Sequence, residues 1–180
     1  SQVEWDNSGL QIGDRNLEII GVLLVLDITD KSVDYAINNG YNFLLSHHPL
    51  FFSDLKSIDF STYKGNLIRN IIENNLFIYS AHTNLDTSER GVNSELANKI
   101  GLKNIQKFSE YIDGEEIGVI GDFPEKNFDG LVENLKKLSK SNHLKIYGTV
   151  KESIEKVGVI GGSGSFGINL AKSLGADCLI

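Results

Sequence analysis

Short apolar runs alternate with helical patterns along the first half of the chain. Residues 21–27 are nearly all aliphatic, which predicts a central strand of a parallel sheet. Thr29 or Asp30 then caps a helix whose apolar positions recur at helical spacing, and Gly40 ends it. The apolar run 42–46 follows directly, so this stretch predicts one βαβ unit with a right-handed crossover.

The same order of elements repeats between residues 53 and 101. A polar connection leads into a helix over about 62–75, whose apolar residues fall on one face. The strand 76–81 comes next, and a short helix after it ends at Gly101. Strands that alternate with helices in this way predict a parallel α/β layer structure.

The pattern changes in the middle of the chain. Residues 105–122 predict a β-hairpin, because Asp113-Gly114 between two strand-like runs suits a tight turn. A helix over about 128–138 follows, and then strands at 144–150 and 157–160. A glycine-rich turn finally leads into a helix that reaches Leu174.

These elements predict a two-lobed α/β fold with mostly parallel sheets flanked by helices. We expect the first lobe to span residues 1–102 and the second to span 103–180. The chain starts without Met and stops inside an apolar run. We therefore expect the second lobe to continue beyond residue 180, because natural termini are usually polar and loose.

Composition narrows the class of protein. The 180 residues carry a net charge of -7, which argues against nucleic acid as a partner, because a phosphate backbone demands clustered Lys and Arg. Cys178 is the single cysteine, so the chain has no intrachain disulfide framework. The sequence shows neither a secretory signal nor an apolar run long enough for a bilayer. We expect a cytoplasmic protein.

Candidate metal ligands follow two predicted strands. His47 and His48 come after strand 42–46, and His82 and Asp86 come after strand 76–81. Neighbouring strands lie ~4.8 Å apart, and ligands bind at the carboxyl edge of such sheets. Consecutive residues leaving a strand point to different sides, so His47 and His48 would hold separate ions, or one would bind while the other packs.

The donor types suit a transition metal. Neutral imidazole and carboxylate groups are ligands for Zn, Fe, Mn, Co or Ni, and the sequence leaves the identity of the metal open. We predict metal ligation by His47 and His48 together with Asp86, and the residues alone leave open whether one ion or two are held. For His82 we predict a supporting role, in which it hydrogen-bonds a ligand or the loop backbone.

The glycine-rich turn offers three alternatives. Gly162, Gly164 and Gly167 match the spacing of the dinucleotide fingerprint, which would indicate a nucleotide-binding oxidoreductase. A tight strand-to-helix turn whose small residues allow close approach is one stronger alternative. The other is an anion-binding nest of backbone amides at Gly162, Ser163 and Gly164. His143, at the end of the helix before this region, is expected to be a solvated or capping residue.

Several motifs together resemble one known family over essentially the whole chain. The family is the NGG-interacting-factor-three-like family, whose members are also called GTP cyclohydrolase I type 2 homologues. The motifs that carry the resemblance lie at 5–14 (Trp-Asp-Asn-x-Gly-Leu-Gln-x-Gly-Asp), 46–50 (Ser-His-His-Pro-Leu), 81–86 (Ala-His-Thr-Asn-Leu-Asp), 91–93, 161–164 and 175–177.

The family resemblance implies a fold, an assembly and a metal site. It implies a two-lobed α/β protein that assembles into a toroidal homohexamer, with dinuclear metal sites facing the interior cavity. Matched residue by residue, it makes His47, His48 and Asp86 metal ligands and places a further His and Glu after residue 180. The function we expect is that of a metal-dependent hydrolase with a small-molecule substrate of unknown identity. The alternative is a non-enzymatic metal-binding scaffold or regulatory protein.

Overall fold

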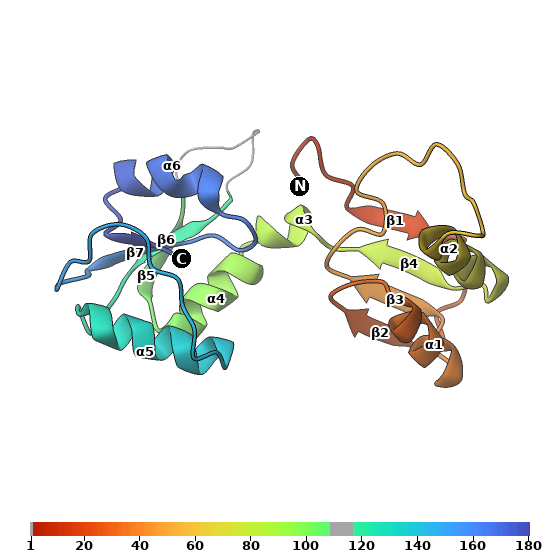
Figure 1. Ribbon diagram of the computed structural model, residues 1–180, viewed down its shortest axis with the longest axis horizontal. Coiled ribbons are helices and arrows are strands. Elements are labelled where there is room, and N and C mark those ends of the chain that lie inside the picture. Colours follow the sequence, from red (N-terminus) through yellow and green to blue (C-terminus); the bar gives the residue numbers. More distant parts are fainter. Residues whose placement is uncertain (1, 109–116) are drawn as a thin grey trace. The chain divides into compact units, whose positions relative to one another are not determined.

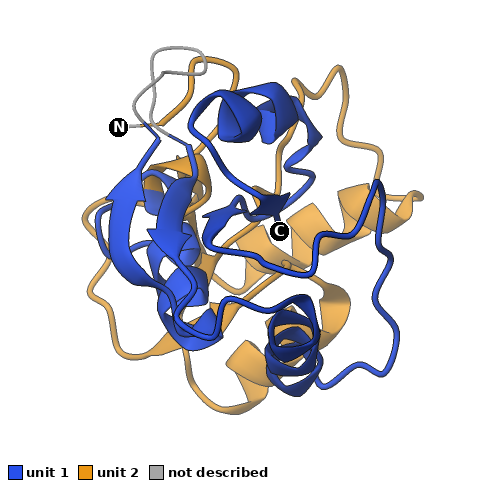
Figure 2. Cartoon of the chain, turned by 90° about the vertical axis from the view of Figure 1, so that its left-hand side faces the viewer, with its two compact units in different colours: residues 1, 85–180 blue, residues 2–84 orange. Residues whose placement is uncertain are grey.

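A computed structural model describes residues 2–108 and 117–180 and divides them into two compact units. The N-terminal unit comprises Gln2–Asn84 and the C-terminal unit begins at Leu85 (orange and blue in Figure 2). Within the described residues each unit contains a four-stranded sheet with helices packed on it (Figure 1). The predicted two-lobed α/β class is therefore confirmed. No helix in the described ranges is both long and apolar enough to cross a membrane.

The sheet of the N-terminal unit is mostly parallel. In spatial order its strands are β1 (Gly9–Ile12), β4 (Phe77–Ser80), β3 (Phe43–Ser46) and β2 (Val22–Val25). Strand β3 pairs in parallel with both β2 and β4, whereas β1 pairs with β4 in the antiparallel sense. Helices α1 (Asp30–Asn38) and α2 (Tyr63–Glu73) are the crossovers. The two predicted strand–helix–strand repeats are thus present.

Local capping explains where these helices begin. The Thr29 hydroxyl accepts a hydrogen bond from the backbone N–H of Ser32, whose own hydroxyl accepts one from the Thr29 N–H, which forms a capping box. Thr62 caps α2 by accepting from the N–H of Gly65 at 3.1 Å. Apolar residues of both helices cover one face of the sheet; this core comprises Val33, Ala36, Leu44, Leu50, Leu67, Ile71, Leu76 and Ile78.

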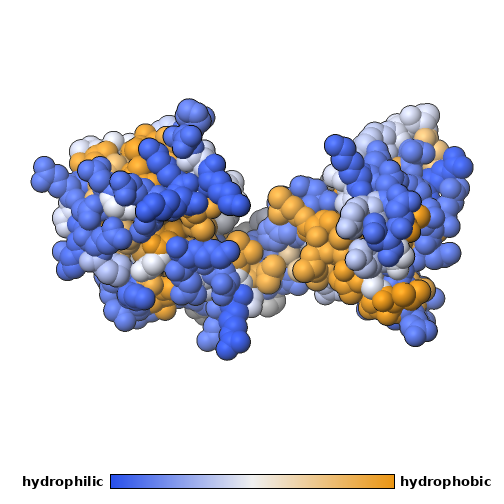
Figure 3. All heavy atoms as spheres, turned by 90° about the horizontal axis from the view of Figure 1, so that it is seen from below, coloured by the Kyte–Doolittle hydropathy of each residue, from blue (hydrophilic) through white to orange (hydrophobic). Residues whose placement is uncertain are grey.

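Strand β2 lies at the edge of its sheet, so the prediction of a central strand was wrong. Leu23 packs against the core, but Val22 and Leu24 on the other face are 45% and 71% exposed. From the side on which β2 lies, the N-terminal unit shows hydrophobic surface (Figure 3). An aliphatic run shows that a strand is apolar on both faces, but it does not fix the number of strands that pair with it.

The C-terminal unit has a different sheet. In spatial order its strands are β5 (Lys103–Lys107), β6 (Val119–Asp122), β7 (Lys156–Val159) and β8 (Cys178–Leu179). Only β7 and β8 pair in parallel, while β5–β6 and β6–β7 are antiparallel. The β5–β6 pairing confirms the strands of the predicted hairpin, and its Asp113-Gly114 turn lies outside the described residues.

Helices after β4 are mostly short. They are α3 (Thr83–Asp86), α4 (Val92–Ile100), α5 (Phe128–Ser139), the 3-10 turn η1 (Ser165–Gly167) and α6 (Ile168–Ser173). The strand predicted at 144–150 does not form. Ile146, Tyr147 and Val150 in this stretch are each more than half exposed, and none of them belongs to either hydrophobic core. An apolar run becomes a strand only where a neighbouring strand accepts its hydrogen bonds.

The boundary between the units falls after residue 84, earlier than the 102/103 division that we expected. The reason is the packing of α4, which lies against β6 and β7 of the second sheet. Ala97 and Ile100 of α4 are buried in the same core as Val119 and Val157. The helix after the second histidine loop therefore belongs to the C-terminal core.

Candidate metal site

Three metal-ligating side chains converge at the ends of β3 and β4. Ser46 and Ser80 are register partners in these parallel strands, so the residues that follow them leave the sheet side by side. His47 follows β3, and β4 continues through His82 into the short helix α3, which carries Asp86. Ligand atoms of His47, His82 and Asp86 all lie within 4.8 Å of one another. Two imidazoles and a carboxylate form a donor set that suits a divalent transition metal.

The orientation of the His47 ring is set by a backbone group. Its Nδ1 lies 2.9 Å from the carbonyl oxygen of Ala81. A carbonyl oxygen only accepts hydrogen bonds, so we infer that Nδ1 carries the proton and that the lone pair is on Nε2. This tautomer presents Nε2 as the ligand atom. The His47 and His82 ring centroids are 5.3 Å apart.

His82 is oriented by a buried carboxylate. Its Nδ1 lies 2.8 Å from Oδ1 of Asp6, whose side chain is completely buried. The other oxygen of Asp6 accepts hydrogen bonds from the Ser8 hydroxyl and from the hydroxyl and backbone N–H of Thr83. Burial by itself would raise the pKa of Asp6, but the hydrogen bonds from Ser8, Thr83 and His82 together lower that pKa to about 2.

The ionised Asp6 fixes the tautomer of His82. Because the carboxylate accepts from Nδ1, the neutral form of the imidazole has its lone pair on Nε2. A carboxylate behind a histidine is the usual support of a metal-ligating imidazole. The geometry therefore places His82 among the candidate ligands, whereas we had predicted a supporting role for it.

His48 lies beside this group but outside it. Its Nδ1 is 2.7 Å from Oδ1 of Asp27, and both side chains are well exposed. The His48 ring centroid is 5.0 Å from that of His47 and 5.9 Å from that of His82. The structure thus brings together His47 and Asp86, as expected, and adds His82. Ligation of a second ion by His48 stays a prediction.

Two carboxylates at the site received no role from the sequence. Asp6 is separated from His82 by 76 residues, and no local spacing connects them. The position of Asp27 at the site could have been predicted from the sequence. Asp27 directly follows the aliphatic run that pairs in parallel with β3. A carboxylate just after a neighbouring strand is expected at the same sheet edge as His47 and His48.

The glycine-rich turn is closely packed. The N–H of Gly161 donates to Oδ1 of Asn93 at 2.6 Å. A Cβ on Gly167 would lie 2.1 Å from Cδ1 of Ile160, so a larger residue here would have to displace the end of that buried side chain. The chain then enters α6, which has six residues. These contacts favour the tight-turn alternative, and anion binding at Gly162, Ser163 and Gly164 stays a prediction. His143 is exposed, in line with a solvated residue.

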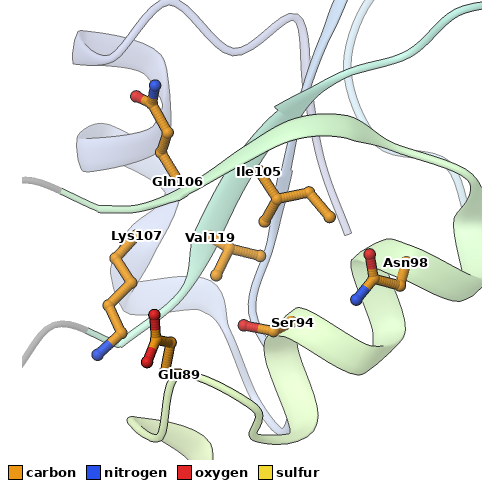
Figure 4. Close-up of a pocket in the computed structure, with 7 residues that line it drawn as sticks. All are labelled: Glu89, Ser94, Asn98, Ile105, Gln106, Lys107 and Val119. Atoms are coloured by element: carbon orange, nitrogen blue, oxygen red, sulfur yellow. The ribbon is translucent and has the colours of Figure 1, made fainter.

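A separate pocket of roughly 500 Å³ lies in the C-terminal unit (Figure 4). Ser94 and Asn98 of α4 line one side, and Ile105 and Val119 form its apolar floor. Lys107 and Glu89 lie at one end, and the Lys107 ammonium donates to the backbone oxygen of Thr87 at 2.8 Å. The lining contains neither histidine nor cysteine. This pocket therefore lacks the donor chemistry of the histidine cluster.

Comparisons with known proteins identify relatives over the whole chain. The family model described as Duf34/NIF3 (NGG1p interacting factor 3) matches residues 1–180. A Clostridium acetobutylicum protein named GTP cyclohydrolase 1 type 2 homolog is 32% identical over 181 residues, covering 98% of this chain and 68% of that protein. A Staphylococcus aureus (strain MRSA252) protein of the same name is 41% identical over 133 residues, covering 68% of this chain and 36% of that protein.

Solved structures show the same fold. A hypothetical protein of Staphylococcus aureus superimposes with a TM-score of 0.89 at 30% identity, covering 99% of this chain and 72% of that one. A Bacillus cereus protein related to NIF3 gives a TM-score of 0.87 at 25% identity, covering 98% and 76% of the two chains. The resemblance inferred from the motifs is confirmed: the chain belongs to the Duf34/NIF3 (NGG1p interacting factor 3) family.

Proposed function

We propose that the protein binds divalent metal through His47, His82 and Asp86 and uses it in a hydrolytic reaction. The observation that carries this proposal is the convergence of the three ligand atoms within 4.8 Å. Support comes from the partners of the two imidazoles, since both Nδ1 atoms face oxygen acceptors. Each histidine is thereby held in the tautomer that ligates through Nε2, and the metal would meet a preorganised donor set.

A dinuclear centre is the finer form of this proposal. His48 is close enough to support a second ion, and the family resemblance assigns it that role. The ligand set His47, His48, His82 and Asp86 carries a charge of about -1 against +4 for two divalent ions. The resemblance assigns the balancing carboxylate to the Glu expected after residue 180. When bound, such ions supply Lewis-acid activation of water or of a substrate oxygen.

The names of the relatives suggest a reaction class. Both curated proteins described above are called GTP cyclohydrolase 1 type 2 homolog, and a cyclohydrolase opens a ring with water. We propose hydrolysis of a small molecule in the cytoplasm by a homohexamer, as the resemblance implies. Light scattering of the purified protein would measure the assembly, and a monomer at micromolar concentration would contradict it.

Metal analysis tests the core of the proposal. The purified protein is loaded with Zn²⁺ or Mn²⁺, dialysed against chelator-free buffer, and measured for metal per chain. We expect at least one ion in the unmodified protein and a marked loss in His47→Ala, His82→Ala and Asp86→Asn. His143→Ala is the matched control, because His143 is exposed and remote in sequence from the cluster. Full occupancy in all three cluster variants would contradict the site.

Turnover is tested separately. Metal-loaded protein is assayed against GTP, phosphoesters and cyclic amides, with the His82→Ala variant as the metal-poor control. Hydrolysis that depends on the metal supports an enzyme. Stable metal binding without turnover of any of these compounds supports instead the scaffold alternative.

A further inference from the structure

Two aromatic rings flank the histidine cluster and remain largely in solvent. Trp5 and Phe52 are each 59% exposed. Their ring centroids lie 6.4 Å and 5.4 Å from that of His82. Both rings stand steeply against the His82 ring, with interplanar angles of 71° and 83°. Exposed aromatic rings that gather beside a polar cluster offer a binding surface for an apolar group.

The loops that carry these rings are fixed to each other. The side-chain amide of Asn7 donates to the backbone oxygen of Phe51 at 2.8 Å. The backbone N–H of Phe51 donates to Oε1 of Gln11 at 3.1 Å, and Nε2 of Gln11 donates to the backbone oxygen of Asn7 at 2.8 Å. Asn7 lies two residues from Trp5, and Phe51 immediately precedes Phe52. The backbone is thus held in place while each of the two side chains keeps 59% of its area exposed.

We propose that Trp5 and Phe52 bind the planar ring of an aromatic or heteroaromatic substrate beside His82. This inference rests on the proposed function, because it names the substrate class of the same site. A planar ring stacks on exposed aromatic faces and covers the apolar area that the protein leaves in water. An open-chain ester or a simple phosphoester has no such face and gains nothing from the two rings.

The two rings also fix where the ligand lies. Both contact the same imidazole, so a molecule that stacks on either ring lies next to a candidate metal ligand. Proximity of this kind is what a reaction at the metal would require. Loss of one stacking ring typically weakens binding by about tenfold or more.

A matched pair of ligands tests the inference. GMP and ribose 5-phosphate share the sugar and the phosphate and differ in the planar base, so calorimetric titration with both isolates the contribution of the ring. We expect GMP to bind at least tenfold more tightly to the unmodified protein. Trp5→Leu and Phe52→Leu should each remove about tenfold of that preference. Tyr35→Leu, which truncates an exposed ring of α1, should leave it unchanged.

Variants that replace one aromatic ring by another separate the loss of the ring from a loss of folding. Trp5→Phe and Phe52→Tyr should retain the preference for GMP, and circular dichroism checks the fold of every variant. Equal binding of the two ligands, or full preference in both leucine variants, would overturn the inference. Titrations with and without Mn²⁺ separate it from the proposed function. A protein that binds metal but ignores the base refutes the ring site alone, and one that prefers GMP yet never binds metal refutes the metal site alone.

Discussion

Different kinds of residue follow the strands of the two sheets. In the N-terminal unit β3 and β4 run in parallel, so the residues after Ser46 and Ser80 emerge at one edge. In the C-terminal unit β6 and β7 are antiparallel, with Val119 opposite Val159, so the residues after β7 lie beside those that precede β6. Of these two strand pairs, only β3–β4 brings two carboxyl ends to one edge of the sheet. The candidate ligands His47, His82 and Asp86 follow two adjacent carboxyl ends, whereas the glycine-rich turn follows the single strand β7.

Two carboxylates sharpen this contrast. Asp6 and Asp177 both have a pKa lowered to about 2. For Asp177 the causes are the Lys151 ammonium and the backbone N–H groups of Lys156 and Glu155, which together outweigh a smaller effect of burial. Asp177 therefore joins the residues before β7 to the start of β8, whereas Asp6 orients His82. A low pKa marks a well-bonded carboxylate, and its partners decide whether its role is structural or functional.

The largest effect should come from removing a ligand of the histidine cluster. We expect His82→Ala to weaken binding of Zn²⁺ by on the order of 100-fold or more, because even loss of an outer hydrogen-bond partner typically costs 10–100-fold. Competition with a chromophoric chelator measures the affinity. A loss of only about tenfold would mean that His82 supports the site without ligating, as we had expected from the sequence, and an unchanged affinity would mean that His82 has no part in metal binding.

Acid should weaken the C-terminal unit through Asp177. The folded pKa of about 2 lies below the ordinary 3.8, so the contribution of the carboxylate is complete above pH ~4 and is lost as the pH falls toward 2. The shift corresponds to about 2 kcal/mol of stability. Asp177→Asn should unfold more readily at pH 7 and show a flatter dependence on pH between 4 and 2. Urea titrations of both proteins at several pH values measure this, and parallel curves would rule it out.

Asp6→Asn keeps the shape of the buried carboxyl and removes its charge. We expect roughly tenfold weaker metal binding, because the amide no longer enforces the Nε2 lone pair of His82. Chelator competition again gives the affinity, and urea unfolding shows how much of the change is lost stability. Wild-type affinity in a stably folded variant would contradict the orienting role of Asp6.

Asp27→Asn is the matched change at the exposed histidine. The Asp27 and His48 side chains are 55% and 40% exposed, and exposed pairs contribute about 0.2–1 kcal/mol. We expect at most a few-fold loss of affinity, and only for a second ion. Metal stoichiometry at saturating Zn²⁺ distinguishes the sites. A loss as large as that of Asp6→Asn would make His48 as important a ligand as His82.

The sequence alone determined the two-lobed α/β class and the place of the site. Apolar runs, helical spacing and the polar residues after them sufficed, because parallel strands bring their carboxyl ends to one edge. His47 and Asp86 were predicted to lie together for that reason, and their ligand atoms do lie within 4.8 Å of each other.

Only the tertiary structure decided the rest. Whether His48 or His82 faces Asp86 depends on how each ring is turned by a partner, and Asp6 is 76 residues from His82 in the chain. The edge position of β2 and the absence of a strand at 144–150 depend on which neighbours pair, which the apolar pattern of a single segment does not record. The apolar periodicity of a segment shows which face of its helix or strand is buried. Residues distant in the sequence determine how a side chain is oriented and how many strands pair with a given strand.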